Sequence, residues 1–357
     1  MNSSVAQPAL CPAAQLDPRS LPPEAFLQAA QDAGVSAGAA RRWAGAVIGR
    51  GECSAAAVLA TSQIGKRFRS LLPDLPALRL CSHIRSESDG FEKLLFEAQD
   101  GLRVETVIIP LLRRGAVSIC LSSQVGCVMG CAFCATARMP TRRNLAAWEI
   151  LDQFIQARGI VLAQGRRVTG AVFMGMGEPF LNFSSVMTAA QWLHFPLEHA
   201  ISGKAITIST VGLVDEIERF TDMALPFRLS ISLGAATDEK RARLVPVAAR
   251  TPVSRVMAAA RRHALARGDR VNLSYVCISG ENVAEEDALA LAALVGDTPV
   301  RLYLIDVTDL SGRYLPPAAG ELKAFRDALS RHLRQPVARR YSGGSDIRAS
   351  CGSLAGI

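Results

Sequence analysis

Three cysteines near the middle of the chain are the residues whose spacing most clearly predicts chemistry. Cys127, Cys131 and Cys134 form a C-x3-C-x2-C pattern within the stretch CVMGCAFC. A zinc site usually takes four ligands, often from two separated C-x2-C pairs, and the sequence holds no second pair of this kind. Three thiolates instead suit a [4Fe–4S] cluster whose fourth iron stays open for a substrate or cofactor. Phe133, directly before the last cysteine, offers a flat apolar ring that either contacts such a cofactor or packs in the core.

The remaining composition indicates a reduced, intracellular protein. Of 357 residues, 49% are hydrophobic and 20% charged, as in ordinary soluble globular proteins of about two domains. The first 21 residues lack the basic start and apolar core of an export signal, and no run approaches the roughly 18 apolar residues that span a bilayer. We therefore expect a cytoplasmic location without membrane contact, where disulfide frameworks are rare. The scattered cysteines then read as buried small hydrophobes, namely Cys11, Cys53, Cys81 and Cys277.

The elements that position the cysteine loop follow from an alternating pattern after Gly115. Apolar segments predict strands at 116–122, 171–176, 205–210, 227–233, 271–278 and 301–307. Amphipathic patterns predict helices between them, at 145–162, 184–193, 252–267, 284–295 and 320–333. This alternation predicts an α/β fold with a parallel sheet and crossover helices, either a barrel or an open sheet. In both, functional residues collect at the carboxyl ends of the strands, which is where the cysteine loop begins.

A smaller N-terminal unit precedes this sheet. We expect residues 1–20 to be disordered and residues 21–112 to form an accessory domain, mostly helical up to about residue 72. The segments 91–98 and 104–110, separated by the turn Asp100-Gly101, predict a small β-hairpin at the end of this domain. The core domain would then span residues 113–357.

A second motif lies where such a sheet places chemistry. Gly175-Met-Gly-Glu178-Pro179 directly follows the strand predicted at 171–176. Its glycines permit a close approach of the backbone to a ligand, and Glu178 offers a carboxylate to an ammonium group. With the cysteine loop, this motif resembles the radical S-adenosylmethionine (SAM) superfamily. The resemblance implies a partial (β/α)6 barrel, a [4Fe–4S] cluster whose open iron is chelated by SAM, and reductive cleavage of SAM to a 5′-deoxyadenosyl radical.

Within that superfamily the chain resembles the RlmN/Cfr family, which methylates adenine in ribosomal RNA and, for some members, transfer RNA. The matching segments run from about residue 80 to the C-terminus and comprise 104–110, 120–127, 174–179, 208–212, 230–233, 244–246 and 346–354. The resemblance implies methylation at C2 of an adenosine in 23S rRNA, with tRNA as a second candidate substrate, through an S-methylcysteine intermediate.

The family route gives roles to three more residues. By the resemblance, the Cys351 thiolate takes a methyl group from SAM, and the radical from a second SAM activates that methyl for addition to the base. Cys120 then attacks the bridging sulfur, which leaves a Cys120–Cys351 disulfide to be reduced, and Glu105 accepts the substrate proton. Taken one by one, each has a plainer reading. Glu105 also fits an exposed strand carboxylate, Cys120 a core residue, and Cys351 a free thiol near a loose tail.

SAM contacts carried over from the family fall on Gly177, Glu178, Ser209, Ser232, Leu233 and Gly234, with Phe133 and Thr308 beside them. Two of these positions depart from the family pattern. Gly234 stands where the family has an imidazole, and Thr308 stands where it has an amide, so the paired donor and acceptor of Asn are lost. The basic stretch before Cys351 is also thinned, to RRYSGGS at residues 339–345.

Charge and partners complete the expectation. A net charge of +8 with repeated Arg pairs favours a polyanion such as RNA, although any single pair is also typical of a solvated surface. We expect a monomer, because no coiled-coil heptads occur, and an external electron donor such as flavodoxin or ferredoxin. Two alternatives stay open. One is a divergent paralogue that uses the same route on another RNA position, a nucleotide or a small metabolite. The other is a non-enzymatic RNA-binding protein with a structural zinc or cluster, which leaves Cys120 and Cys351 without a role.

Overall fold

A computed structural model of the chain describes residues 17–54 and 74–356. Its centre is a ten-stranded sheet in the order β1-β2-β3-β4-β7-β8-β9-β10-β11-β12. The strands from β4 onward run parallel, and they are β4 (Ala116–Cys120), β7 (Arg167–Phe173), β8 (Ile206–Thr210), β9 (Arg228–Ser232), β10 (Val271–Cys277), β11 (Val300–Asp306) and β12 (Val337–Arg339). The sheet ends at β1 and β12 without closing, so the barrel is partial, as the sequence predicts.

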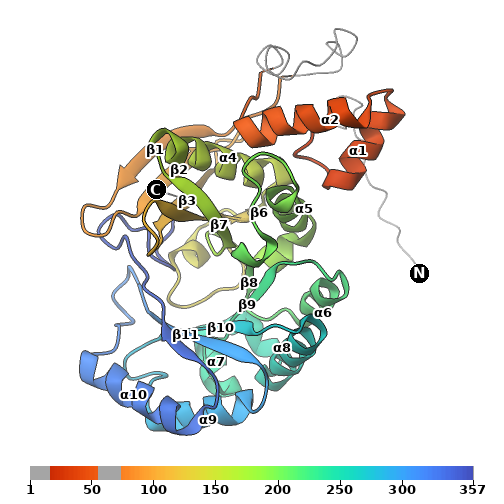
Figure 1. Ribbon diagram of the computed structural model, residues 1–357. Helices are drawn as coiled ribbons and strands as arrows, with labels where there is room; N and C mark the ends of the chain where they lie inside the picture. Colours follow the sequence, from red (N-terminus) through yellow and green to blue (C-terminus); the bar gives the residue numbers. More distant parts are fainter. Residues whose placement is uncertain (1–16, 55–73, 357) are drawn as a thin grey trace.

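Helices connect consecutive parallel strands and lie along the outer side of the curved sheet (Figure 1). They are α4 (Ala147–Ala163), α5 (Phe183–His194), α6 (Val214–Asp222), α8 (Val253–Arg267), α9 (Glu285–Val295) and α10 (Ala319–His332). Together with β4 and β7–β11 they form six β/α units, which confirms the predicted (β/α)6 core. Two helices escaped prediction, α6 and the seven-residue α7 (Asp238–Leu244), because both are short and rich in charged residues.

The parallel strands place their carboxyl ends along one edge. Every residue of β4 and of β8 is buried, as expected for strands covered on both faces. Residue pairing between β10 and β11 runs from Val271 opposite Val300 to Cys277 opposite Asp306, so neighbouring strands end at the same level. Loops after these ends therefore meet above one edge of the sheet, where the sequence predicts the site.

Antiparallel strands extend the sheet on the N-terminal side. β2 (Glu92–Glu97) and β3 (Arg103–Pro110) form the predicted hairpin, and β3 pairs with β4 with Val107 opposite Cys120. β1 (Arg79–Arg85) pairs with β2 and was not predicted, because its side chains are mostly polar and exposed. The boundary expected between residues 112 and 113 falls in the β3–β4 connection, within one continuous sheet.

Ahead of these strands lie α1 (Pro23–Asp32), α2 (Ala37–Ala44) and a π-helical turn (Gly45–Gly49). The predicted helical segment at 55–72 and residues 1–16 of the predicted disordered end lie outside the described residues. For residues 17–20 the expectation of disorder is wrong. Arg19 is fully buried there and contacts Asp17 at 3.1 Å and Asp152 of α4 at 3.3 Å. The two carboxylates compensate the buried guanidinium, which ties this turn to the core. In the described ranges we find no helix with the length and apolar character needed to cross a bilayer.

Candidate active site

The cysteine loop leaves the carboxyl end of β4 and is held in place by backbone contacts. A two-residue ladder between β5 (Gln124–Val125) and β6 (Arg143–Asn144) closes its base. Within the loop the Ala132 amide donates to the Leu244 carbonyl at 3.0 Å, and the Ala135 amide donates to the Gly352 carbonyl at 2.8 Å. The loop is thereby fixed against both α7 and the C-terminal segment.

The three cysteines of this loop are free thiols that lie close enough to influence one another. Cys127 is buried and Cys131 and Cys134 are half-buried. Burial, with the charges of Glu178 and Cys134, raises the pKa of the Cys127 thiol to about 11. Raised pKa values mean that the protein alone does not stabilise thiolates here, whereas binding to iron would. Within the described ranges no three His, Cys, Asp or Glu side chains converge as ligands of one metal ion. A cubane cluster does not need that, because each thiolate binds a different iron. The set fits such a cluster.

The GMGEP motif forms the wall beside this loop. Gly177 has a positive φ of +99°, and a Cβ there would lie 2.6 Å from Cβ of Gln124, so only glycine fits. The Glu178 side chain is buried, and its two oxygens accept the amides of Phe180 at 3.1 Å and Val211 at 2.9 Å. Burial raises the pKa of Glu178 to about 7 despite these hydrogen bonds. A nearby cation would stabilise the ionised form of this buried carboxylate. The ammonium group of SAM, the contact expected from the sequence, would be such a cation.

Both motifs line one cavity at the carboxyl ends of the strands. Six of the eight predicted SAM contacts line it, namely Phe133, Gly177, Glu178, Ser209, Ser232 and Gly234, together with Cys131, Cys134 and Cys351. Two do not. Leu233 is fully buried, and its carbonyl accepts a hydrogen bond from the Arg241 guanidinium at 3.2 Å. Thr308 is half-buried, with its carbonyl near Gly352 of the C-terminal segment.

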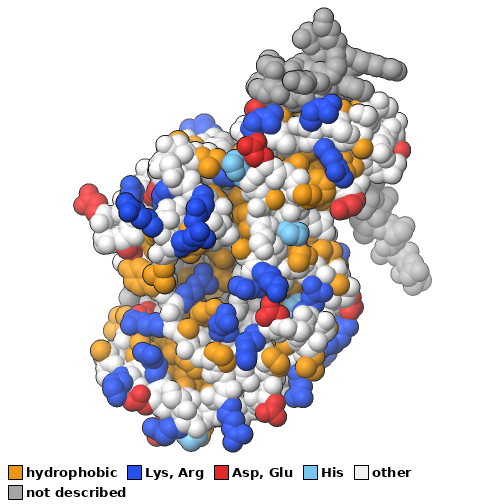
Figure 2. Space-filling view, in the orientation of Figure 1, with side chains coloured by type: hydrophobic (Ala, Val, Ile, Leu, Met, Phe, Trp, Pro, Cys, Tyr) orange, Lys and Arg blue, Asp and Glu red, His pale blue; other side chains and the backbone are white. Residues whose placement is uncertain are grey.

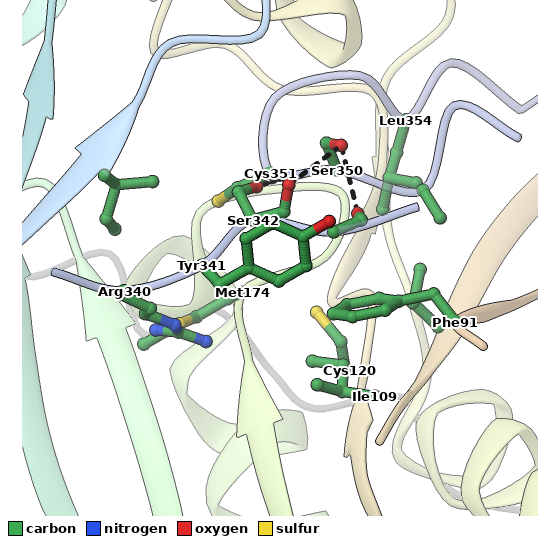
Figure 3. Close-up of a pocket in the computed structure, with 14 residues that line it drawn as sticks. Phe91, Ile109, Cys120, Met174, Arg340, Tyr341, Ser342, Ser350, Cys351 and Leu354 are labelled. Carbon is green, nitrogen blue, oxygen red and sulfur yellow. Dashed lines mark hydrogen bonds between the residues drawn. The ribbon is translucent and has the colours of Figure 1, made fainter. Parts of the chain in front are cut away.

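A second cavity adjoins the first and is lined by the other two cysteines with a predicted role (Figure 3). Cys120 at the end of β4 and Cys351 in the C-terminal segment line it, with Phe91, Met174, Arg340 and Tyr341 around them. Cys351 and Met174 are shared by the two cavities. The Cys351 amide donates to the Ser342 hydroxyl at 2.9 Å, which fixes the backbone that carries the thiol. Cys351 thus stands between the cysteine loop and Cys120.

The thiols in this second cavity differ in environment. Cys120 is buried, and loss of hydration raises its pKa to about 12, with the charge of Cys351 adding to the rise. Cys351 is an exposed residue, although loss of hydration at its thiol raises the pKa. The Arg340 guanidinium lowers the pKa of both thiols, so it is placed to favour a thiolate at either sulfur. Both cysteines are unpaired in the structure.

Glu105 lies apart from both cavities. It is fully buried on β3, not exposed as one reading of the sequence suggested. One carboxylate oxygen pairs with Lys93 Nζ at 2.8 Å. The other accepts the amides of Ala355 at 2.8 Å and Gly356 at 3.1 Å. The carboxylate therefore holds the end of the segment that carries Cys351.

The departures from the family pattern have visible structural consequences. Gly234 has a φ of +77°, and a Cβ at this position would lie 3.0 Å from Val245, so the loop after β9 is shaped around glycine. Next to Thr308, the buried Asp309 carboxylate pairs with Arg138 of the cysteine loop and accepts the Ser311 amide at 3.0 Å. These contacts connect the loop after β11 to the cysteine loop by an ion pair.

Sequence reasoning missed the residues that surround the reactive thiols. Arg340 and Tyr341 were noted only as part of a thinned basic stretch, and Phe91 only as the start of a strand. No local motif marks them, since they meet Cys120 only through the fold. The only sequence feature that could have drawn attention to them is the position of Arg340, a basic residue a short distance before Cys351.

Comparisons with known proteins agree with this geometry. Residues 121–292 match the family model of the radical SAM superfamily. A probable RNA methyltransferase of Anaeromyxobacter sp. is 45% identical over 331 residues, covering 91% of this chain and 95% of that protein. A probable dual-specificity RNA methyltransferase RlmN of Moorella thermoacetica is 38% identical over 303 residues, covering 82% of this chain and 84% of its own.

Similarity extends to a solved structure. The crystal structure of a radical SAM methyltransferase from Sphaerobacter thermophilus superposes with a TM-score of 0.87 at 31% identity, covering 95% of this chain and 99% of that one. Radical SAM methyltransferases use a [4Fe–4S] cluster and SAM, the two groups that the first cavity fits. The chain therefore belongs to the RlmN/Cfr family of radical SAM methyltransferases.

Proposed function

We propose that this enzyme methylates C2 of an adenosine in 23S rRNA or tRNA through a methyl group carried on Cys351. The observation that carries the proposal is the position of Cys351, which lines both the cavity of the cysteine loop and the cavity of Cys120. A carrier must meet a methyl donor on one side and an acceptor on the other. Among the described residues, Cys351 is the thiol that lines both cavities.

The residues of the first cavity would hold the cofactors. Cys127, Cys131 and Cys134 would bind the cluster, and Glu178 would bind the SAM ammonium, with Ser209 and Ser232 beside it. When bound, the cluster and SAM supply the electron, the methyl group and the radical. An external reductant such as flavodoxin or ferredoxin belongs to the proposal, as does a monomeric state.

The second cavity would carry the steps on the protein. The Cys351 thiolate attacks the methyl carbon, so that a bond from Cys351 Sγ to that carbon forms as the carbon–sulfonium bond of SAM breaks. Arg340 favours the thiolate that this step needs. After the methyl carbon is joined to the base, the Cys120 thiolate attacks Cys351 Sγ. An S–S bond forms as the bond from Sγ to the base-linked carbon breaks. That carbon keeps the electron pair and takes up a proton, which completes the methyl group, and an external thiol reduces the disulfide.

RNA as the substrate is supported by the similarity to RNA methyltransferases and by charge. Figure 2 shows many Lys and Arg side chains on one face of the molecule, including around its central hollow, and fewer Asp and Glu side chains. With a net charge of +8, such a face attracts a polyanion through counterion release. The phosphates of RNA supply that charge.

One assay tests the proposal. The anaerobically reconstituted enzyme is incubated with SAM, a reductant and unmodified 23S rRNA or tRNA, and the digested nucleosides are identified by mass spectrometry. We expect 2-methyladenosine in one of the two RNAs. Formation of 8-methyladenosine would assign a different carbon. Methylated Cys351 with no methylated nucleoside would favour the divergent paralogue, and colourless zinc-bound protein the non-enzymatic alternative.

A further inference from the structure

Tyr341 stands out as an exposed aromatic side chain at the reactive cavity. Its relative exposure is 70%, and it is the one aromatic among the exposed large hydrophobic residues of the described ranges. It lines the same cavity as Cys120 and Cys351. In the view of Figure 3 its ring lies across the pocket between these two cysteines. Exposing an aromatic ring to water forgoes the gain of burying it, which points to a partner that covers it during turnover.

The ring is held in a fixed place. The Tyr341 hydroxyl donates to Asp89 Oδ2 at 2.9 Å, and the ring meets Phe91 edge-to-face, with centroids 6.1 Å apart and an interplanar angle of 75°. Gly343 brings the backbone against Phe91, since a Cβ there would lie 2.4 Å from Phe91 Cε2. An immobile aromatic platform costs little entropy when a flat ligand stacks on it.

The segment that carries Tyr341 stays on the β1–β2 turn through contacts other than that of the Tyr341 hydroxyl. Asp89 Oδ2 also accepts the Gly344 amide at 2.8 Å, and Asp89 Oδ1 accepts the Phe91 amide at 3.3 Å. Asp89 therefore keeps partners if the phenol is removed. The contacts of Gly343 and Gly344 against Phe91 persist as well. Holding the tail does not explain why an aromatic ring occupies this position.

The surroundings suit a nucleobase. The walls of the cavity are mostly apolar, with Val107, Ile109, Met174 and Ile305, and one cation, Arg340. The Arg340 guanidinium contacts the Met174 sulfur at 2.9 Å, a weak acceptor that leaves most of its donors free for a ligand. A flat ring with polar edges matches an apolar slot with one cationic donor, and aromatic side chains bind unstacked bases by this means.

We propose that the ring of Tyr341 is the surface on which the target nucleobase stacks as it enters the cavity of Cys120 and Cys351. The proposal rests on the proposed function and adds the group that recognises the base. Stacking is tolerant of base identity, so Tyr341 would hold the base flat near Cys351, while choice among bases would depend on other contacts.

Three substitutions test it, Tyr341→Phe, Tyr341→Leu and Tyr341→Ala, with Leu112→Ala as a control at an exposed side chain away from the cavity. The substrate is the RNA that the wild-type enzyme methylates, and KM and kcat are measured separately. Methyl loading of Cys351 without RNA is followed by mass spectrometry, and circular dichroism melting checks the fold. We expect KM for RNA to rise roughly tenfold or more for Ala and Leu, and to stay near wild type for Phe and for Leu112→Ala.

Several outcomes would overturn the proposal. An unchanged KM in the Ala and Leu variants would remove the stacking role. A Phe variant as impaired as the Ala variant would assign the effect to the hydroxyl and Asp89. A loss confined to methyl loading would place Tyr341 on the SAM side. If wild-type enzyme methylates no RNA, the proposed function fails first, and binding of unmodified tRNA transcript to wild type and Tyr341→Ala then decides the stacking claim alone.

Discussion

Cys120 and Cys351 line one cavity although they lie near opposite ends of the core domain in sequence. Cys120 ends β4, and Cys351 belongs to the C-terminal segment. Their electrostatic coupling shows in the pKa of Cys120, which the charge of Cys351 raises further. In the proposed function, this arrangement would bring the carrier thiol Cys351 and the resolving thiol Cys120 to one substrate. The roles proposed for Cys120 and Cys351, and for the residues that position them, can each be tested by substitution.

Replacing Cys120 should trap the enzyme on its substrate. In Cys120→Ala no thiolate can cleave the link from Cys351 to the base, so a covalent protein–RNA adduct should accumulate and turnover should stop. Denaturing gel electrophoresis with labelled RNA measures the adduct. Cys351→Ala should give none, and Cys81→Ala, on the edge strand β1, should behave as wild type. Free methylated RNA from Cys120→Ala would contradict the resolving role.

Removing one ligand of the cysteine loop should abolish both colour and methyl loading. Cys131→Ala leaves two thiolates for a cluster that needs three here, and Cys351 lines the same cavity as the loop. We expect loss of the brown iron–sulfide absorbance and loss of the +14 Da methyl on the peptide that carries Cys351. Chelation of iron from the wild-type enzyme should stop further loading. Full loading in Cys131→Ala would show that the methyl reaches Cys351 by a route independent of the cluster.

Arg340 should set the pH dependence of methyl loading. Its charge lowers the pKa of Cys351, whereas burial raises it, so Arg340→Met should shift that pKa upward. At pH 7 the thiolate fraction falls roughly tenfold for each unit of rise, and the loading rate falls with it. Loading by the variant should rise with pH but lag behind wild type at each pH up to 9, because its thiol titrates at a higher pH. The neighbouring Arg339→Met, which removes an exposed ion pair with Asp306, serves as the control. Identical pH profiles for Arg340→Met and wild type would exclude this role.

The sequence predicted what depends on local pattern. The strand and helix alternation, the cysteine loop and the GMGEP turn all rest on short-range signals, and the structure places six of the eight expected SAM contacts at one cavity. Contacts set by tertiary packing were not predictable. Arg19 looked like part of a disordered end, yet Asp152 of α4 buries it. Glu105 fitted an exposed strand position, yet the C-terminal segment covers it. In both cases the deciding partner lies more than a hundred residues away.

A buried histidine should make the fold sensitive to acid. His263 of α8 stacks on Phe220 with centroids 5.4 Å apart, and its Nδ1 lies 2.9 Å from the Thr221 hydroxyl. Burial, with Arg267 and Arg262 nearby, lowers its pKa from 6.5 to about 4. Between these two values the unfolded chain binds a proton that the folded protein excludes, so stability falls as the pH falls. The loss attributable to His263 is about 2 kcal/mol between pH 7.5 and pH 5.

Chemical denaturation at pH 7.5 and pH 5 measures this effect in wild type and His263→Gln. Other groups also titrate in this range, so the informative quantity is the difference between the two proteins. We expect the variant to be less stable at pH 7.5, because ring packing is lost, and to lose less stability on acidification. Parallel stability changes in the two proteins would show that His263 does not titrate as its burial implies.

We expect the main contribution of Glu105 to be the fixing of the C-terminal segment that carries Cys351. In Glu105→Gln the amide oxygen still accepts the Ala355 and Gly356 amides, but the buried ion pair with Lys93 is lost. Loss of one partner of a buried ion pair destabilises a fold, so we expect a lower unfolding midpoint and weaker methyl loading of Cys351. The double variant Glu105→Gln/Lys93→Met removes both charges of the buried pair, and should recover part of the stability and the loading.

The double variant also separates two roles of Glu105. One is to hold the C-terminal segment in place, and the other is the proton transfer that the family resemblance implies. A glutamine keeps the hydrogen bonds of the segment but accepts no substrate proton. We therefore expect the double variant to load Cys351 at close to the wild-type rate and to form little methylated RNA. If methylated RNA forms at the wild-type rate, holding the segment is the whole contribution of Glu105, and another group must take the proton. Loading that stays low despite restored stability would instead mean that the Lys93 charge itself positions the end of the chain.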